Sequence, residues 1–66
     1  MKKTGKIIEF DGFSGAIVDK EGIKYIFSNN DLLENSLKIN DIVCFEGELF
    51  QTVDVKIYIA RFVRKK

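Results

Sequence analysis

Short runs of Ile, Val and Phe follow one another along this 66-residue chain, with turn residues between them. In residues 23–28, Ile23, Tyr25 and Phe27 alternate with Lys24, Ile26 and Ser28. Side chains alternate across an extended strand, so we expect the first three on the core side and the others outside. Proline is absent, and the β-branched composition favours strands over helices. The pattern predicts a small all-β domain.

Five strands account for these runs. We expect them over residues 4–10, 13–19, 23–28, 42–48 and 53–63. Asp11-Gly12 and the four residues from Asp19 to Gly22 are typical hairpin turns. A slip in alternation near Ala60 predicts a bulge in the last strand. Residues 49–52 contain no Gly or Pro, so the sequence does not locate the last turn.

Asn29, Asn30 and Asp31 interrupt the pattern after the third strand. Asp side chains accept hydrogen bonds from free backbone amides, so we expect Asp31 to cap a short helical turn over residues 32–34. Five strands with one such turn favour a closed barrel over a sandwich, because closure removes exposed strand edges. We expect one domain spanning residues 1–66.

The formal net charge is +1, from 11 basic and 10 acidic residues. Such a balance argues against strong nonspecific DNA binding, which needs a basic surface. Much of the positive charge lies near the two ends of the chain, at Lys2, Lys3, Lys6, Arg61, Arg64, Lys65 and Lys66. Two interpretations stay open: solvated ends that keep a small protein soluble, or an edge that attracts phosphate.

The residue types argue against an enzyme. The chain has no His and one Cys, which excludes a disulfide framework, common zinc sites and histidine-based catalysis. Cys44 lies between two strand residues with no activating base, which is typical of a packing residue. Glu46 and Glu48 share one strand face, which favours a solvated surface over a cation site. We expect no catalytic residues, metal or cofactor.

No apolar run follows the basic start of the chain as it would in a secretory signal, and none approaches the length of a membrane span. We therefore expect a cytoplasmic protein that does not bind membranes.

The order of these segments resembles the cold-shock domain family. The first strand of that family reads Gly-Lys-Val-Lys-Trp-Phe and the second Gly-Phe-Gly-Phe-Ile. The matching segments here are Gly5–Phe10, Phe13–Ile17, Tyr25–Ser28, Asn30–Leu32, Val43–Phe45 and Ala60–Val63. They span nearly the whole chain. The resemblance implies an OB-type barrel, closed and five-stranded, with a short helical turn between strands 3 and 4.

The chain departs from that family where bases are read. Glu9 stands in the place of a stacking tryptophan, and Ser14 and Ala16 stand in the places of two phenylalanines. Ile26 and Ser28 replace a stacking phenylalanine and a histidine. Stacking on an aromatic ring is worth about 1–3 kcal/mol per base, so the resemblance implies only weak binding.

We expect most of the other phenylalanines to lie in the core. We assign Phe10, Phe27, Phe45 and Phe62 to packing. Alternation with Gly15 and Ile17 favours a core position for Phe13 too, although a shortened loop could tilt its ring onto the open face. Phe50 lies in the unplaced link and is a contact residue if it is exposed.

The sequence thus favours a divergent cold-shock-like protein that binds single-stranded RNA or DNA weakly. The residues expected to bind nucleic acid are Lys6, Ile8, Phe13, Lys24, Ile26 and Ser28. On this hypothesis Lys24→Glu weakens binding and flattens its salt dependence.

The alternative is a protein-interaction or structural barrel that has lost its ligand and meets a protein partner, or a second copy, at Ile8 and Ile26. A related resemblance is to the small bacterial initiation-factor type of OB barrel, which binds ribosomal RNA chiefly through basic residues.

Overall fold

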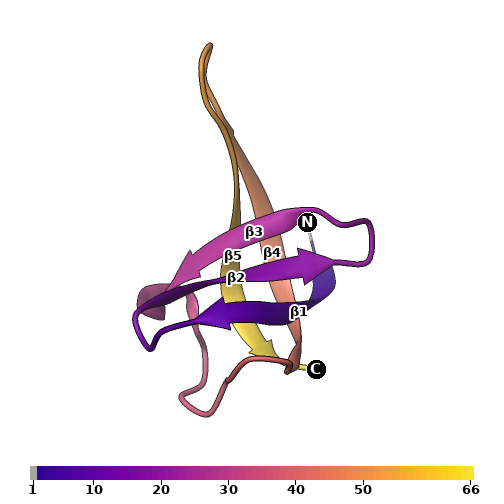
Figure 1. Cartoon of the computed structure of the whole chain (residues 1–66), viewed down its shortest axis with the longest axis vertical. Coiled ribbons are helices and arrows are strands. Elements are labelled where there is room, and N and C mark those ends of the chain that lie inside the picture. The colour runs from indigo at the N-terminus through magenta and orange to yellow at the C-terminus, as the bar shows by residue number, and fades with distance from the viewer. Residues whose placement is uncertain (1) are drawn as a thin grey trace.

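A computed structural model describes residues 2–66 as a five-stranded closed barrel (Figure 1). Its elements are β1 (Lys2–Phe10), β2 (Ser14–Asp19), β3 (Lys24–Ser28), the 3-10 turn η1 (Asn29–Asp31), β4 (Ile42–Gln51) and β5 (Lys56–Lys65). The order around the barrel is β1-β2-β3-β5-β4, and β4 pairs with β1 to close it. β3 and β5 run parallel, whereas the other neighbours run antiparallel. The expected OB-type barrel with one helical turn between strands 3 and 4 is confirmed.

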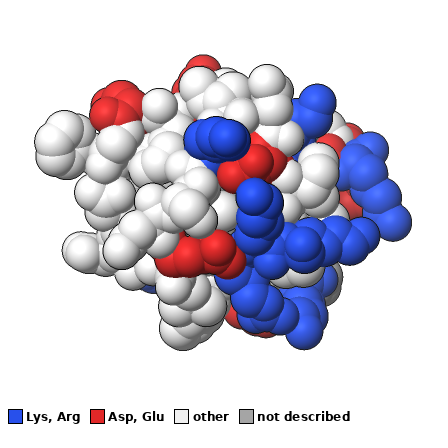
Figure 2. Space-filling model, turned by 90° about the horizontal axis from the view of Figure 1, so that it is seen from below, with Lys and Arg blue, Asp and Glu red and all other residues white. Residues whose placement is uncertain are grey.

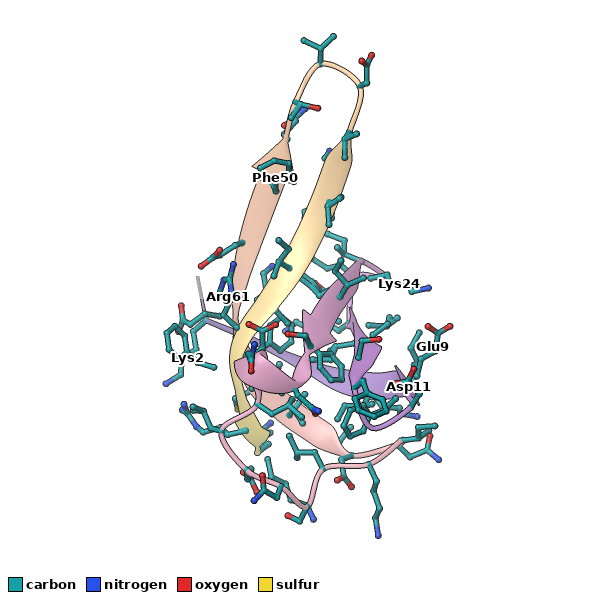
Figure 3. The ribbon with its side chains drawn as sticks, turned by 90° about the vertical axis from the view of Figure 1, so that its left-hand side faces the viewer. Lys2, Glu9, Asp11, Lys24, Phe50 and Arg61 are labelled. Carbon is teal, nitrogen blue, oxygen red and sulfur yellow. The ribbon has the colours of Figure 1, made fainter. Side chains whose placement is uncertain are left out.

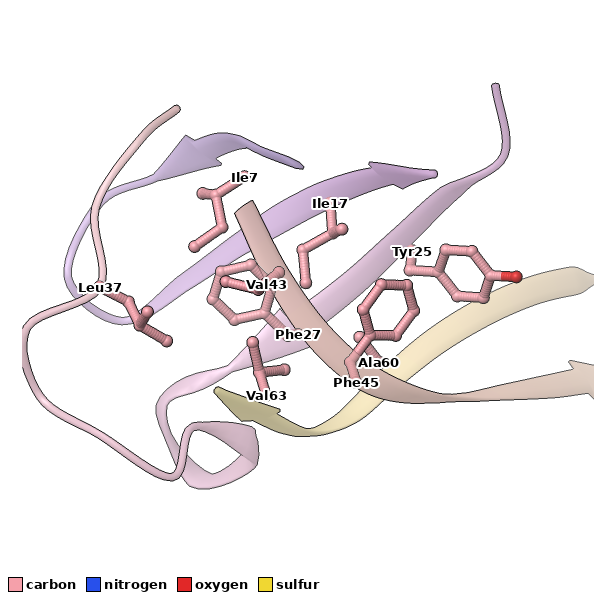
Figure 4. Close-up of a cluster of buried hydrophobic side chains, with 9 residues drawn as sticks. All are labelled: Ile7, Ile17, Tyr25, Phe27, Leu37, Val43, Phe45, Ala60 and Val63. Carbon is pink, nitrogen blue, oxygen red and sulfur yellow. The ribbon is translucent and has the colours of Figure 1, made fainter. Parts of the chain in front are cut away.

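Nine buried side chains fill the barrel (Figure 4). They are Ile7, Ile17, Tyr25, Phe27, Leu37, Val43, Phe45, Ala60 and Val63. The ring of Tyr25 meets those of Phe45 and Tyr58 edge-on, with centroids 4.9 and 5.4 Å away. Tyr25 and Phe27 are both inward, as alternation in the third strand predicts, and Ile23 packs against the cluster from its edge.

β4 and β5, with 10 residues each, are the longest strands in residues 2–66. Residues 49–51, which the sequence left unplaced, continue β4, and the turn falls at residues 52–55. There the amide of Thr52 donates to the carbonyl of Val55 at 2.7 Å, and the Val55 amide donates to Oγ1 of Thr52 at 3.1 Å. The two strands leave the barrel as a two-stranded hairpin (Figure 1). We call residues 48–59 the β4–β5 arm.

The helical turn lies earlier than expected. It spans Asn29–Asp31 rather than residues 32–34, so the expected role of Asp31 as its first capping residue is wrong. Asp31 is instead the last residue of the turn, and its carboxylate accepts the backbone amide of Ser28 at 2.9 Å. A carboxylate three residues after the cap satisfies a free amide by reaching backwards.

The expected bulge exists in β5, two residues beyond Ala60. Cys44 pairs with Arg64 and Glu46 with Arg61, so β5 has one more residue than β4 between these pairs. Phe62 adopts a left-handed φ of 54° there and is 56% exposed. The prediction that Phe62 packs in the core is therefore wrong. The bulge turns its ring outward and places Val63 in the core instead.

A second irregularity shapes β1. Ile7 pairs with Ile17 and Glu9 pairs with Ala16, which leaves Ile8 as an extra residue between them. Ile7 stays fully buried, whereas Ile8 is exposed on the outside of the barrel. The extra residue lets β1 bend while it pairs with both β2 and β4.

Within residues 2–66 no helix is long and apolar enough to cross a membrane.

Candidate nucleic-acid interface

The outer surface of β1, β2 and β3 is hollowed. The hollow has a volume of about 940 Å³, and isoleucines from four segments contribute to its wall: Ile8, Ile26, Ile39 and Ile59. Ala16, which pairs with Ile26 across β2 and β3, is buried beneath them. We call this surface, with its rim at residues 11–14, the apolar face.

Phe13 is the most exposed aromatic residue of this rim, with 76% of its surface accessible. Its amide donates to Oδ1 of Asp11 at 2.8 Å, and its carbonyl accepts the amide of Asn29 at 2.9 Å. The amide of Ser14 donates to the same Asp11 oxygen at 2.9 Å. Both backbone groups of Phe13 are therefore held, while its ring faces solvent. The expectation that Phe13 packs in the core is wrong, because its ring is exposed to solvent.

The amides of Ser14 and Phe13 also act on the charge of Asp11. Hydrogen bonds to a carboxylate favour its ionised form, so they hold the pKa of Asp11 below its ordinary value. The loop that presents Phe13 is thus tied to an ionised carboxylate.

The six residues expected to bind nucleic acid do not all meet. Ile8, Lys24, Ile26 and Ser28 line the apolar face, as the pattern predicts. Phe13 lies between Asp11 and Ser14, which also line it. Lys6 does not line this face and lies in a second groove instead.

Cations of the apolar face are held by carboxylates. Nζ of Lys24 lies 3.7 Å from Oε2 of Glu9. Arg61 bridges two carboxylates, Glu48 and Asp31, at 3.1 Å each. The hydrogen bond and charge of Glu48, together with the charge of Asp31, raise the pKa of Arg61. Three carboxylates and two cations line the face, which is therefore apolar with a small excess of negative charge: Glu9, Asp11, Asp31, Lys24 and Arg61. Figure 3 shows Lys24 and Glu9 together on one side of the barrel.

A second groove lies along the outer side of β1, between β4 and the β2–β3 turn. Its volume is about 990 Å³, and its charged residues are Lys2, Lys3, Lys6, Lys20, Lys66, Asp19 and Glu21. Lys and Arg gather on one side of the molecule when it is seen from below (Figure 2). We call the groove lined by these seven residues the basic groove. The sequence pointed to it only through the positive charge near the two chain ends.

Lys3 is the lysine of this groove that is engaged with carboxylates. Its Nζ lies 3.8 Å from Oδ2 of Asp19 and 3.7 Å from Oε1 of Glu21. Although desolvation opposes the effect, interactions with Tyr25, Glu21 and Asp19 raise the pKa of Lys3. Asp19 is buried, and its Oδ1 accepts the amides of Glu21 and Ile23, which holds the β2–β3 turn.

Of the other candidate residues, Phe50 lies apart from both surfaces, whereas Phe10 lines the apolar face and Cys44 lines the basic groove. Phe50 is 54% exposed on the β4–β5 arm, and Phe10 is half-buried with its ring 5.5 Å from that of Phe27. Cys44 is half-buried and carries a free thiol. Among residues 2–66 no group of three or more His, Cys, Asp or Glu is placed to hold a metal ion.

Comparison of the chain with protein-family models, curated proteins and solved structures finds no match. The resemblance to cold-shock domains therefore stays a prediction.

Proposed function

We propose that this chain is a divergent cold-shock-like OB barrel that binds single-stranded RNA or DNA weakly, with its bases on the apolar face. The observation that carries the proposal is Phe13, a solvent-facing ring on a hydrogen-bonded backbone between Asp11 and Ser14, two residues that line the hollow. An exposed ring can stack on a base, and a backbone that is ordered before binding lowers the entropic cost of doing so. OB barrels commonly use the outer surface of strands 2 and 3 for oligonucleotides.

The same surface explains why binding is weak. Ile8 and Ile26 give apolar contact but no ring on which a base can stack. Glu9 adds a carboxylate that repels phosphate, and it holds the lysine that would otherwise attract phosphate. One ring supplies about 1–3 kcal/mol per stacked base, where a full platform supplies several such contributions.

A protein partner is the second candidate. The paired charges of Lys24 and Arg61 leave a hollow that is apolar and has no unpaired cation among residues 2–66, which suits a protein surface. This function predicts self-association or capture of a specific protein at Ile8 and Ile26, and Ile26→Asp then disrupts it. Light scattering that shows only monomer, together with measured oligonucleotide binding, contradicts this alternative.

Titration of fluorescently labelled single-stranded RNA and oligo-dT at low and moderate salt tests the first function. We expect micromolar affinity that weakens as salt rises. Phe13→Ala should lower affinity by about 5- to 150-fold, which corresponds to the loss of one stacked base. Phe50→Ala is the matched control, because Phe50 is an exposed ring on the β4–β5 arm. Equal effects of both changes, or no binding by the unaltered protein, would falsify the proposal.

A further inference from the structure

We infer that the basic groove, and not the apolar face, holds the phosphate backbone of the bound strand. The inference rests on the proposed function and adds a second site to it. Bases would lie on the apolar face, while the phosphodiester chain would follow the outer side of β1. The ligand class is therefore a single-stranded polynucleotide whose anionic backbone is read separately from its bases.

Among residues 2–66, most lysines of the basic groove are not paired with carboxylates. In the described part of the chain, Lys2, Lys6, Lys20 and Lys66 make no ion pair, although all four line the groove. Both carboxylates of the groove, Asp19 and Glu21, are bridged by Lys3. Lysines without a partner keep their full attraction for phosphate, whereas a lysine already beside a carboxylate attracts it less.

The fold explains how lysines from distant parts of the sequence come together. Lys6 pairs with Ile42 of β4 on one side and with Val18 of β2 on the other. The amide of Lys66 donates to the carbonyl of Ile42 at 3.0 Å, which brings the last residue of the chain to the same strand. Lys2 is less isolated, since the β1–β4 register places Glu46 opposite it. Lys6, Lys20 and Lys66 therefore form the centre of the phosphate site.

The apolar face and the basic groove are also continuous with one another at Ile8. Ile8 lines both the apolar face and the basic groove, because the extra residue in β1 sets its side chain on the boundary. A strand whose base contacts Ile8 can therefore place its adjoining phosphates in the groove without leaving the surface. Figure 3 shows Lys2 on the side of the barrel away from Lys24 and Glu9. The two surfaces thus meet along β1 and diverge from it.

The salt dependence of oligonucleotide affinity tests whether the basic groove contacts phosphates. For single strands the slope of log K against log salt is about −0.7 for each phosphate neutralised. The change of Lys6 and Lys20 together to Gln should make the slope shallower by about 1.4. Lys38→Gln with Lys56→Gln is the matched control, because it removes two exposed lysines that line neither surface. We expect the control to leave the slope unchanged.

A companion variant separates the two surfaces. Ile26→Ser should lower affinity at every salt concentration and leave the slope as it is, because it removes apolar contact and no charge. If the double groove variant loses its thermal unfolding transition, Lys20→Gln alone replaces it, since Lys20 lies exposed in a turn. The slope should then fall by about 0.7.

The outcomes are distinguishable. No binding by the unaltered protein overturns both the function and this inference. Binding by the unaltered protein, with a slope that the groove variants do not change, overturns the inference alone. Binding whose slope falls in the groove variants and not in the control supports both.

Discussion

The apolar face and the basic groove share strand β1, yet they treat charge in opposite ways. On the apolar face, Lys24 and Arg61 lie beside carboxylates. In the groove, Lys6 and Lys20 have no such partner among residues 2–66. A net charge of +1 therefore conceals two surfaces of different character. The attraction of each surface for phosphate therefore depends on whether its lysines are paired with carboxylates, and not only on how many lysines it has.

The largest effect should come from removing the support of the apolar face. A Cβ on Gly15 would clash with the carbonyl oxygen of Glu9 and lie 2.7 Å from Cζ of Phe27. Backbone cannot retreat as a side chain can, so Gly15→Ala should lower the free energy of unfolding by about 3 kcal/mol. Urea denaturation measures this loss. Gly22→Ala is the control, with φ +85° and open space around it, and should cost about 1 kcal/mol. Equal losses would show that the approach of β1 to β2 is not the constraint.

A stacking ring restored to the apolar face should raise its affinity for single-stranded nucleic acid. Glu9 is an exposed side chain on the rim of the hollow, so Glu9→Trp should be tolerated. It adds a ring and frees Lys24, and we expect a gain of about 5- to 150-fold in affinity. The chain has no other Trp, so quenching of its fluorescence by the oligonucleotide reports stacking directly.

Glu9→Gln is the control for that gain. It frees Lys24 without adding a ring and should give a smaller increase in affinity with a steeper salt slope. An identical gain in both variants would assign the effect to charge alone. No gain in either would mean that the strand does not reach this part of the apolar face.

Protonation of Asp11 at acid pH should lower the stability of the folded protein. Its pKa is lowered in the folded protein, so its contribution to stability is present above the ordinary pKa of Asp and is lost as pH falls through the lowered value. Thermal midpoints measured from neutral pH down to about pH 2 should fall less steeply in Asp11→Asn than in the unaltered protein. Parallel curves for the two proteins would mean that the Asp11 carboxylate does not stabilise the turn that carries Phe13.

The smallest effect is expected at Lys24. Because Lys24 lies 3.7 Å from Glu9, Lys24→Gln should change the salt slope by less than the value of about 0.7 expected for an unpaired lysine. Lys20→Gln, measured alongside it, gives the unpaired value. A change at Lys24 as large as that at Lys20 would mean that the ion pair opens on binding, and the contrast between the two surfaces would then disappear.

Much of the barrel could be predicted from the sequence. Alternation placed Tyr25 and Phe27 in the core, and turn residues located the first two hairpins, because both signals act over a few neighbouring residues. The last hairpin was not located, because Thr52 and Val55 form its turn without Gly or Pro. A turn made by backbone and hydroxyl hydrogen bonds leaves little trace in composition.

The site was less predictable, for two physical reasons. A change of one residue in strand pairing reverses the side that a ring faces, and this is what exposes Phe62 at the β5 bulge. Ion pairs between strands depend on spatial register, so nothing local in the sequence joins Lys24 to Glu9. Of the six residues proposed to bind nucleic acid, Ile8, Lys24, Ile26 and Ser28 line the apolar face, whereas Lys6 lines the basic groove.

The β4–β5 arm has a practical consequence for anyone who handles this protein. Its tip lies far from the closed barrel, and Val53 there is fully exposed (Figures 1 and 3). Both proposed binding surfaces are built from other parts of the chain, apart from Ile59 at the base of the arm. Exposed loop tips accept insertions and new chain ends better than any other position. The tip at residues 53–54 is therefore where a label, an affinity tag or a second domain can be grafted without disturbing what the barrel holds.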